Sequence, residues 1–275
     1  MNLPELPEVE TVKETLKRKV LNQRINSVDI LWPGIIAYPT VEEFKENIKN
    51  QKINDITRRG KWLIFELDNY ILMSHLRMEG KYFLKSKNDE LKKHEHVIFN
   101  LDKSKQLRYH DTRKFGKMHL IKKEDFNNYE VIQELGLEPW DEKLNIKYLK
   151  DKYKNKRLPI KTVILDQSII TGIGNIYADE ILFLSGINPL TKANKLKDKE
   201  LENIIHNTKI TLEKAISEGG TTIRSYTSDE GVSGKFQNNL YVHQREKEKC
   251  LNCGSEIIKI KVGGRGTYYC PNCQK

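Results

Sequence analysis

The four cysteines of this 275-residue chain all lie near its C-terminal end, as two C-x-x-C pairs separated by sixteen residues. They are Cys250, Cys253, Cys270 and Cys273. Two disulfides or a chance arrangement are the alternatives, but two pairs at this separation are typical of one tetrahedral Zn²⁺ site. Four thiolates leave no coordination position for water, so the metal would be structural. We therefore expect a small module that zinc holds together, because its core is too small to fold alone.

The charge balance of the chain favours a polyanionic partner. Lys and Arg number 48 against 38 Asp and Glu, which gives a formal net charge of +10. Nucleic acid is the first candidate, although charge alone is weak evidence. The sequence has no apolar run near the roughly 20 residues that cross a bilayer, and its first residues lack the apolar segment of a signal peptide. Thiols that are available for metal indicate a reducing, cytoplasmic compartment.

The spacing of apolar residues changes along the chain, and it predicts the helices and strands that must position these groups. Apolar residues recur at helical spacing in 7–21, and short strand-like runs then dominate 25–122, with Asp68-Asn69 as a hairpin turn. Helical spacing returns at 176–184 and 201–216. The predicted fold is α+β, with an N-terminal β-sandwich or barrel with flanking helices in 1–130, a helical domain in 131–240 and a zinc-bound hairpin in 241–275.

Six motifs then occur in a recognisable order. Pro4-Glu-Leu-Pro-Glu-Val-Glu10 alone reads as ordinary helix capping. The others are Arg58-Arg-Gly-Lys-Trp62, Asp111-Thr-Arg-Lys-Phe-Gly116, Thr171-Gly-Ile-Gly-Asn-Ile-Tyr-Ala178, Gly219-Gly-Thr-Thr222 and the four cysteines. Together they resemble bacterial formamidopyrimidine-DNA glycosylase over almost the whole chain. The resemblance implies a helix–two-turn–helix middle domain and a DNA-repair enzyme that removes oxidised purines, such as 8-oxoguanine and formamidopyrimidines, and then cuts the abasic strand.

The resemblance also assigns catalytic roles. Pro4 would be the nucleophile, because its secondary amine can attack the sugar carbon C1′ and collapse to an iminium ion. Glu5 would protonate the sugar ring oxygen, and Glu8 would support the opened sugar. Lys61 would donate the proton in β-elimination, although a solvated lysine at a strand edge is the plainer interpretation. Arg265, at the tip of the zinc hairpin, would hold phosphates and assist δ-elimination.

Further residues match the family's DNA contacts. His94, Arg113, Lys156 and Asn175 correspond to positions that bind the backbone, and Asn175 also suits the turn of a helix hairpin. Base flipping leaves a gap in the stack, and Met78, Arg113 and Phe115 correspond to the residues that fill it, with core packing as the alternative for Met78 and Phe115. His94 and His96 lack a third metal ligand in the sequence. Residues 221–236 are expected to cover the flipped base, with 224–226 reading it.

The chain departs from the family pattern at two places. Met1, Asn2 and Leu3 precede Pro4, whose nitrogen is then an amide without nucleophilic character. We expect translation to start at the Leu3 codon, as TTG, with removal of the initiator methionine exposing Pro4. The second departure is Val242-His-Gln-Arg245, where the family often has a glycine. A changed linker turn without changed chemistry is expected there.

Three other functions remain open from the sequence. Endonuclease VIII shares the architecture but prefers oxidised pyrimidines, and it usually has glycine where Leu6 stands. A non-catalytic binder of damaged DNA would result if residues 1–3 are retained. A zinc-ribbon protein that binds RNA leaves the N-terminal motif unexplained. We expect a monomer that binds double-stranded DNA in the bacterial cytoplasm, at the nucleoid, with one structural Zn²⁺ and no membrane contact.

Overall fold

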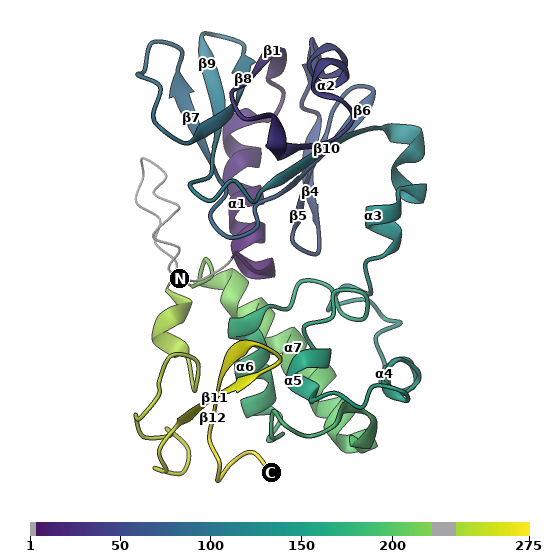
Figure 1. Cartoon of the computed structure of the whole chain (residues 1–275), viewed down its shortest axis with the longest axis vertical. Coiled ribbons are helices and arrows are strands. Elements are labelled where there is room, and N and C mark those ends of the chain that lie inside the picture. Colours follow the sequence, from purple (N-terminus) through teal and green to yellow (C-terminus); the bar gives the residue numbers. More distant parts are fainter. Residues whose placement is uncertain (1–3, 222–234) are drawn as a thin grey trace. The chain divides into compact units, whose positions relative to one another are not determined.

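The computed structural model describes residues 4–221 and 235–275, which form two compact units. The first unit is built mainly from Glu8–Gln133 (Figure 1). The second contains Glu5–Pro7 and the described residues between Glu134 and Lys275. The N-terminal segment thus contributes to both units, because the division passes between Pro4 and Glu5 and again between Pro7 and Glu8.

Two five-stranded sheets make up the first unit, which confirms the predicted β-sandwich. Their strand orders are β3-β1-β8-β9-β7 and β2-β10-β6-β5-β4. Paired strands are antiparallel, apart from the parallel pair of β2 and β10. The strands are β1 (Arg24–Ile30), β2 (Ile36–Tyr38), β3 (Gln51–Lys52), β4 (Asp55–Arg59), β5 (Trp62–Glu66), β6 (Tyr70–His75), β7 (Lys81–Ser86), β8 (Glu95–Leu101), β9 (Lys105–His110) and β10 (Lys117–Lys122). The predicted hairpin is present, since β5 pairs with β6 across residues 67–69.

Helices flank this sandwich. Helix α1 (Leu6–Val20) buries the apolar face that its spacing predicted, through Val9, Val12, Leu16 and Val20. Helix α2 (Val41–Ile48) lies in a region that we expected to be mostly strands. It begins with a capping box, in which Thr40 accepts from the Glu43 N–H and the Glu43 carboxylate accepts from the Thr40 N–H. The T-x-x-E pattern was therefore a signal for this helix in the sequence. The shorter helical segments are η1 (Pro33–Ile35), η2 (Lys123–Asn128) and α3 (Glu130–Gln133).

The second unit is helical around one central helix. Helix α6 (Asn175–Leu184) buries every residue from Ile176 to Phe183, so it is enclosed on all sides. Helix α7 (Asp198–Ser217) packs against it, and Gly219 and Gly220 follow its end with φ of 75° and 79°. The remaining helices are α4 (Ile146–Tyr153), α5 (Ile160–Val163), η3 (Ala193–Lys195) and η4 (Phe236–Asn239). Two acidic residues, Asp179 and Glu180, are enclosed with this helix and therefore require polar partners.

A two-stranded hairpin closes the second unit, as predicted. Strands β11 (Ile258–Val262) and β12 (Arg265–Tyr269) pair antiparallel around Gly263 and Gly264. Both glycines have positive φ, 54° and 80°, which is the conformation that a two-residue turn requires. A small core of its own forms beside the cysteines from Phe183, Val242 and Ile257. Within the described ranges, no helix is both long and apolar enough to span a bilayer.

Candidate functional site

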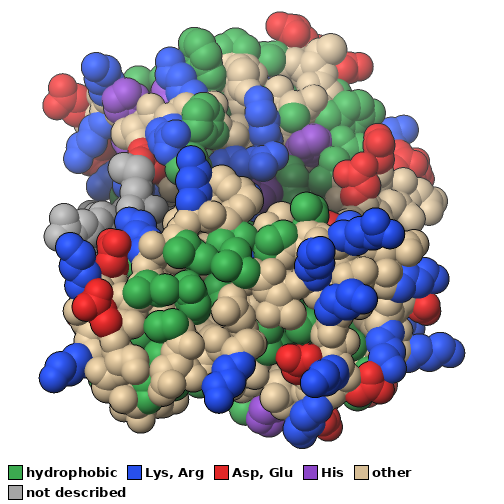
Figure 2. Space-filling view, turned by 60° about the horizontal axis from the view of Figure 1, so that its bottom comes forward, with side chains coloured by type: hydrophobic (Ala, Val, Ile, Leu, Met, Phe, Trp, Pro, Cys, Tyr) green, Lys and Arg blue, Asp and Glu red, His purple; other side chains and the backbone are tan. Residues whose placement is uncertain are grey.

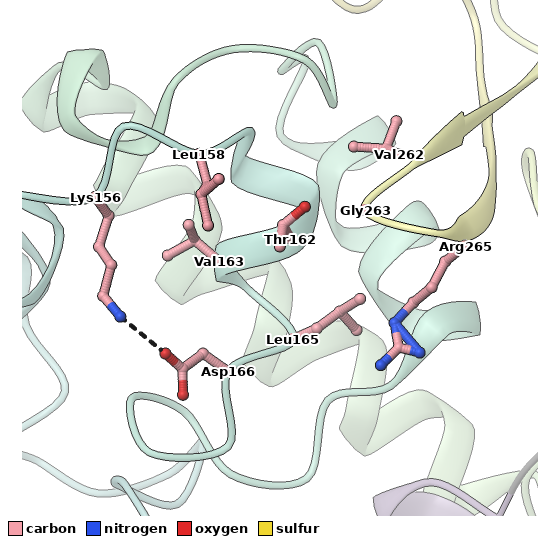
Figure 3. Close-up of a pocket in the computed structure, with 9 residues that line it drawn as sticks. All are labelled: Lys156, Leu158, Thr162, Val163, Leu165, Asp166, Val262, Gly263 and Arg265. Atoms are coloured by element: carbon pink, nitrogen blue, oxygen red, sulfur yellow. Dashed lines mark hydrogen bonds and ion pairs between the residues drawn. The ribbon is translucent and has the colours of Figure 1, made fainter.

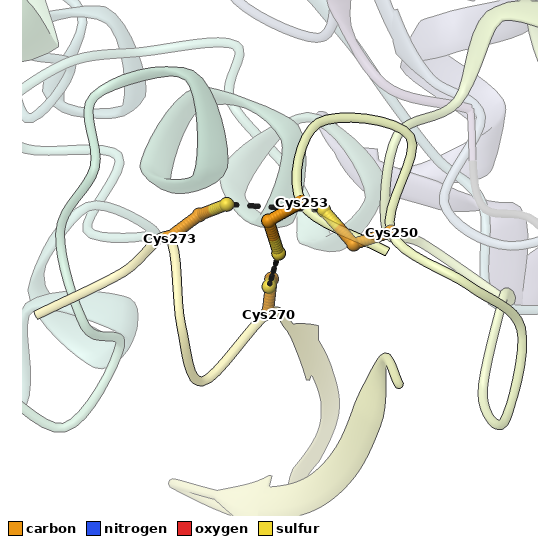
Figure 4. Close-up of side chains that lie close together, drawn as sticks. All are labelled: Cys250, Cys253, Cys270 and Cys273. Carbon is orange, nitrogen blue, oxygen red and sulfur yellow. Dashed lines mark hydrogen bonds between the residues drawn. The ribbon is translucent and has the colours of Figure 1, made fainter. Parts of the chain in front are cut away.

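The four cysteine sulfurs converge on one point (Figure 4). All four Sγ atoms lie within 4.8 Å of one another, with 3.9 Å between Cys250 and Cys273 and 3.4 Å between Cys253 and Cys270. Zn–S bonds of about 2.3 Å place the sulfurs of a tetrahedral site about 3.8 Å apart, so the spacing fits Zn²⁺. A disulfide needs about 2.05 Å, so the disulfide alternative does not describe this arrangement. Among the described residues this is the sole group of three or more potential ligands.

The electrostatics of the cysteine cluster depend on each sulfur's surroundings. Hydrogen bonds with Ser255 and Asn272 lower the pKa of Cys253 to about 5, so this sulfur is a thiolate at neutral pH. Burial raises the pKa of Cys270. Zinc binding requires thiolates at all four positions, so it works against the raised pKa of Cys270. A bound Zn²⁺ would offset the negative charge of the four thiolates.

Glu5 caps the N-terminus of α6. Its carboxylate accepts hydrogen bonds from the backbone N–H groups of Ile176, at 2.8 Å, and Tyr177, at 3.3 Å. A helix N-terminus favours a carboxylate through its unpaired N–H groups and its dipole. Glycine makes this approach possible, because a Cβ on Gly174 would lie 2.2 Å from the Glu5 carboxyl carbon. The T-G-I-G-N motif thus fixes the carboxylate that follows Pro4 in the chain.

Asn175 and Arg265 belong to one connected part of the second unit. The Asn175 side-chain amide donates to the carbonyl of Gly266 at 3.0 Å, which joins the start of α6 to strand β12. Arg265, the first residue of β12, is exposed next to the glycine turn. The hairpin that zinc supports is therefore held against the helix that binds Glu5.

Lys156 lies at the edge of a cavity of about 260 Å³ that the hairpin turn also lines (Figure 3). Its Nζ is 3.1 Å from Asp166 Oδ2, and both side chains are partly exposed. Arg265 lines the same cavity, so the structure brings two of the residues expected to contact DNA to one surface. The ion pair with Asp166 was not anticipated from the sequence.

In the first unit, the loop of Arg113 and Phe115 is built around a buried carboxylate. Asp111 accepts hydrogen bonds from the backbone N–H groups of Arg113, Phe115 and Gly116, at 3.0, 2.9 and 2.8 Å. The Arg113 guanidinium lies over the Phe115 ring, 4.8 Å from its centroid, and about half of the Phe115 surface is exposed. An exposed aromatic residue held this way is not core packing, which removes the alternative for Phe115.

Met78 lies in a neighbouring turn that shares a support with this loop. A Cβ on Gly80 would lie 2.3 Å from the Tyr109 hydroxyl, and one on Gly116 would lie 1.7 Å from the same atom. Both glycines therefore pack directly on Tyr109. The turn that carries Met78 and the loop that carries Arg113 and Phe115 thus rest on the same tyrosine, and Met78 itself is partly buried.

Lys61 lies in the turn between β4 and β5, beside Gly60, whose φ is 57°. The turn is fastened to α1, because Arg58 donates to the Glu10 carboxylate at 2.8 Å and to the Gly60 carbonyl at 2.9 Å. Burial of the Glu10 carboxylate acts to raise its pKa. The hydrogen bonds from Lys13 and Arg58 outweigh this effect and hold the pKa of Glu10 below its usual range. Lys61 therefore occupies a turn whose backbone is fixed.

The remaining predicted positions are placed as follows. Glu8 is buried on α1, and Pro4 is also buried. The His94 ring contacts those of His96 and His110, with centroids 6.1 and 5.8 Å away. Residues 1–3 and 222–234, including the expected base-reading segment 224–226, lie outside the described residues. Figure 2 shows Lys and Arg side chains scattered across the face in view, in keeping with the basic composition.

Sequence reasoning missed a set of buried charged groups in the second unit. Lys161 and Asp179 are completely buried and form an ion pair of 2.6 Å. His243 lies 2.7 Å from the other oxygen of Asp179. Glu180 accepts from three consecutive backbone N–H groups of the linker, Tyr241, Val242 and His243. The signal that could have found them was two acidic residues in an otherwise apolar helix.

Comparisons with known proteins agree with this arrangement. Three family models match, and their descriptions are Formamidopyrimidine-DNA glycosylase N-terminal domain for residues 3–118, Formamidopyrimidine-DNA glycosylase H2TH domain for 135–227, and Zinc finger found in FPG and IleRS for 247–275. The Formamidopyrimidine-DNA glycosylase of Oceanobacillus iheyensis is 50% identical over 273 residues, which cover 99% of this chain and 98% of that protein. The Bacillus subtilis protein of the same name is 47% identical, with 99% of both chains covered.

Solved structures are similar over the same length. A mutant Lactococcus lactis FPG in complex with DNA that contains Fapy-dG has a TM-score of 0.93 and 40% identity, with coverage of 99% of this chain and 100% of that chain. The Lactococcus lactis Fpg in complex with abasic DNA gives the same values. A complex of the wild-type protein with DNA containing an oxidised pyrimidine has a TM-score of 0.92 and 39% identity, with the same coverage.

Proposed function

The chain belongs to the formamidopyrimidine-DNA glycosylase family, and on that premise we propose that it excises oxidised purines from duplex DNA and cuts the abasic strand. The substrates are 8-oxoguanine and formamidopyrimidines. Because such a base is stacked inside the duplex, it must be flipped out before its sugar can be reached. The basic composition and the DNA complexes of similar structures support double-stranded DNA as the partner.

The placement of Glu5 carries the proposal. Its carboxylate is oriented by the Ile176 and Tyr177 N–H groups and by the absence of a side chain at Gly174. Glu5 directly follows Pro4, so an acid of fixed orientation lies next to the proposed nucleophile in the chain. Positioning of this kind supplies much of the rate of an enzyme reaction. In the proposed reaction, the nitrogen of Pro4 forms a bond to C1′ as the bond from C1′ to the base breaks, and the base leaves with the proton that the Pro4 nitrogen loses. Glu5 protonates the ring oxygen of the sugar as the bond between C1′ and that oxygen breaks, which leaves the iminium ion between Pro4 and C1′.

The nucleophile requires a free imino group at Pro4. While Leu3 is attached, the lone pair of the Pro4 nitrogen is delocalised into an amide, and no iminium ion can form. A free α-amino group has a pKa of roughly 8, so a useful fraction is neutral near pH 7. We therefore propose that the active form begins at Pro4. The match to the N-terminal family model begins at Leu3, so Met1 and Asn2 lie outside it and Pro4 is its second residue.

The remaining residues act on the DNA backbone and on strand cutting. Lys61 would donate a proton during β-elimination, and Glu8 would support the opened sugar. Arg265 would bind the phosphates that flank the lesion and assist δ-elimination, with His94, Lys156 and Asn175 as further backbone contacts. Met78, Arg113 and Phe115 would occupy the space that the flipped nucleotide leaves, since an exposed aromatic ring and a guanidinium can replace part of the lost stacking. Zinc, held by the four cysteines, supplies no reactive group and keeps the hairpin folded.

Two forms of the protein test this proposal. One begins at Pro4 with a free amine, and the other carries Met1–Leu3, with intact mass confirming both termini. Each is incubated with a duplex containing 8-oxoguanine opposite cytosine, with and without borohydride. We expect cleavage and a covalent protein–DNA adduct from the first form alone. An equal yield from the form with Met1–Leu3 intact would show that another group is the nucleophile, and binding without cleavage by both would leave a damaged-DNA binder.

Oxidised pyrimidines are a second candidate substrate. The observation that favours them is the similar Lactococcus lactis complex with an oxidised pyrimidine. A duplex containing such a base, assayed beside the 8-oxoguanine duplex under single-turnover conditions, decides the order of preference. We expect faster excision of the purine, and the reverse order would place the activity with endonuclease VIII.

A further inference from the structure

Three buried side chains of the second unit, Lys161, Asp179 and His243, form a connected series. Lys161 of α5 and Asp179 of α6 are both fully buried, and Lys161 Nζ lies 2.6 Å from Asp179 Oδ1. The other oxygen of Asp179 accepts from His243 Nδ1 at 2.7 Å, and His243 is itself buried. Because a carboxylate only accepts hydrogen bonds, Nδ1 is the ring nitrogen that carries the proton. Asp179 thus has one cationic or hydrogen-bonding partner on each oxygen.

At one end of this series, Lys161 contacts the helix that orients Glu5. Lys161 Nζ donates a second hydrogen bond, of 2.8 Å, to the backbone carbonyl of Asn175, the first residue of α6. The next two residues, Ile176 and Tyr177, provide the N–H groups that hold the Glu5 carboxylate. The position of Lys161 therefore bears directly on the first turn of α6.

The other end reaches the zinc hairpin. The His243 ring packs edge-on against Tyr268 of β12, with centroids 5.0 Å apart and an interplanar angle of 67°. Strand β12 begins with Arg265, and its Gly266 carbonyl accepts the side-chain hydrogen bond from Asn175. The linker, the hairpin and the first turn of α6 are consequently joined in a closed ring of contacts.

The backbone around His243 has an independent anchor. Glu180 accepts from the N–H groups of Tyr241, Val242 and His243 at 2.7, 3.0 and 2.9 Å. The next residue, Gln244, has φ of 62°, the left-handed conformation that glycine adopts without strain. A change of the His243 side chain therefore leaves three hydrogen bonds that hold the linker, so its effect reports on the side chain.

We propose that His243 is a positioning residue for base excision and strand cutting. By donating to the second oxygen of Asp179, it keeps that carboxylate from turning both oxygens towards Lys161. Lys161 is then available to fix the Asn175 carbonyl, which sets the N–H groups that orient Glu5. The ring contact with Tyr268 extends the same restraint to the hairpin with Arg265. This inference rests on the proposed function for its kinetic consequences, although the coupling itself can be measured without it.

Three substitutions separate the donor from the ring. His243→Asn places an amide N–H close to the position of Nδ1, whereas His243→Gln places its amide near Nε2 and cannot reach Asp179 in the same way. His243→Phe keeps the ring contact with Tyr268 and removes the donor. In the zinc-loaded protein that begins at Pro4, the measurements are the single-turnover excision rate on an 8-oxoguanine duplex, the ratio of β- to β,δ-elimination products, and the Kd for a duplex with a tetrahydrofuran abasic analogue.

We expect His243→Phe and His243→Gln to slow excision tenfold or more, with the Kd changed less than threefold, and His243→Asn to remain within threefold of the unchanged protein. The proposal is overturned if His243→Phe keeps the full rate, if His243→Asn is as slow as His243→Phe, or if the entire loss lies in Kd. If His243→Phe loses its zinc and the other two variants keep theirs, the excision rates of His243→Asn and His243→Gln decide the proposal.

A second readout is independent of activity. Amide hydrogen exchange at Ile176 and Tyr177 should accelerate at least tenfold in His243→Phe and His243→Gln but not in His243→Asn. The amides of Thr208 and Leu212, buried on α7, are the internal control, because a general loss of stability accelerates them as well. An unchanged protein that excises nothing would refute the proposed function, while the exchange pattern would still accept or reject the role of His243.

Discussion

Replacement of Gly174 by alanine is the most direct perturbation of the acid that the site depends on. The backbone at this position has φ of −123° and ψ of −163°, an extended conformation that alanine adopts as readily as glycine. The new Cβ, however, would lie 2.2 Å from the Glu5 carboxyl carbon and 2.5 Å from Oε1. The substitution therefore acts through a steric contact whose three nearest atoms all belong to Glu5.

The magnitude follows from the distance. Carbon atoms in contact lie about 3.5 Å apart, so Glu5 must move by more than about 1 Å. The hydrogen bonds from Ile176, at 2.8 Å, and Tyr177, at 3.3 Å, do not survive a shift of that size. Overpacking and the loss of partners for buried N–H groups each cost about 1–3 kcal/mol, so Gly174→Ala should destabilise the protein by about 2–6 kcal/mol. A catalytic group displaced by about 1 Å lowers the rate on the order of a hundredfold.

Urea unfolding and single-turnover excision measure the two effects. Gly254→Ala is the matched control, because Gly254 has φ of 74° but no atom within 4 Å of an added Cβ. That variant should lose only about 1 kcal/mol through backbone strain and keep the excision rate. A Gly174→Ala protein with a rate within threefold of the unchanged protein would refute the assignment of Glu5 to the reaction, and equal stability would refute the close contact.

Three further results are expected. Cys253→Ala should reduce bound zinc from one ion to below a tenth by atomic absorption and weaken binding of abasic-analogue DNA at least tenfold, and retention of zinc would contradict the four-sulfur site. His75, whose Nδ1 accepts from the Arg77 N–H, has its pKa lowered to about 3, chiefly by burial. As the pH falls, the unfolded chain therefore binds a proton at His75 before the folded protein does, and stability is lost below about pH 6.5. In urea titrations at pH 5, the protein should have lost about 1–2 kcal/mol of its free energy of unfolding relative to His75→Gln, which lacks this titration. Glu180→Gln should cost about 2–3 kcal/mol, because one amide oxygen cannot accept the three linker N–H groups, and a loss under 0.5 kcal/mol would contradict this.

Local patterns account for what the sequence could predict. The apolar face of α1 and the hairpin of β5 and β6 follow from spacing within a few residues, and the cysteine pairs follow from the reach of two sulfurs in one turn. Helix α2 was missed although its capping box was legible, because the surrounding strand signals dominated. The shared support of Met78 and Phe115 on Tyr109 could not be predicted, since it depends on two glycines 36 residues apart meeting one hydroxyl group.

The buried charges show where sequence reasoning reaches its physical limit. Asp179 and Glu180 in an apolar helix imply polar partners, because an uncompensated carboxylate in the interior costs several kcal/mol. The need for a polar partner does not say which group supplies it, and Asp179 and Glu180 meet this need in different ways. Glu180 uses backbone N–H groups, which nearly any sequence at 241–243 could offer, whereas Asp179 needs the side chains of Lys161 and His243. Substitutions in the linker should therefore be tolerated at Val242 more readily than at His243, and this difference arises from which atoms of the linker are used.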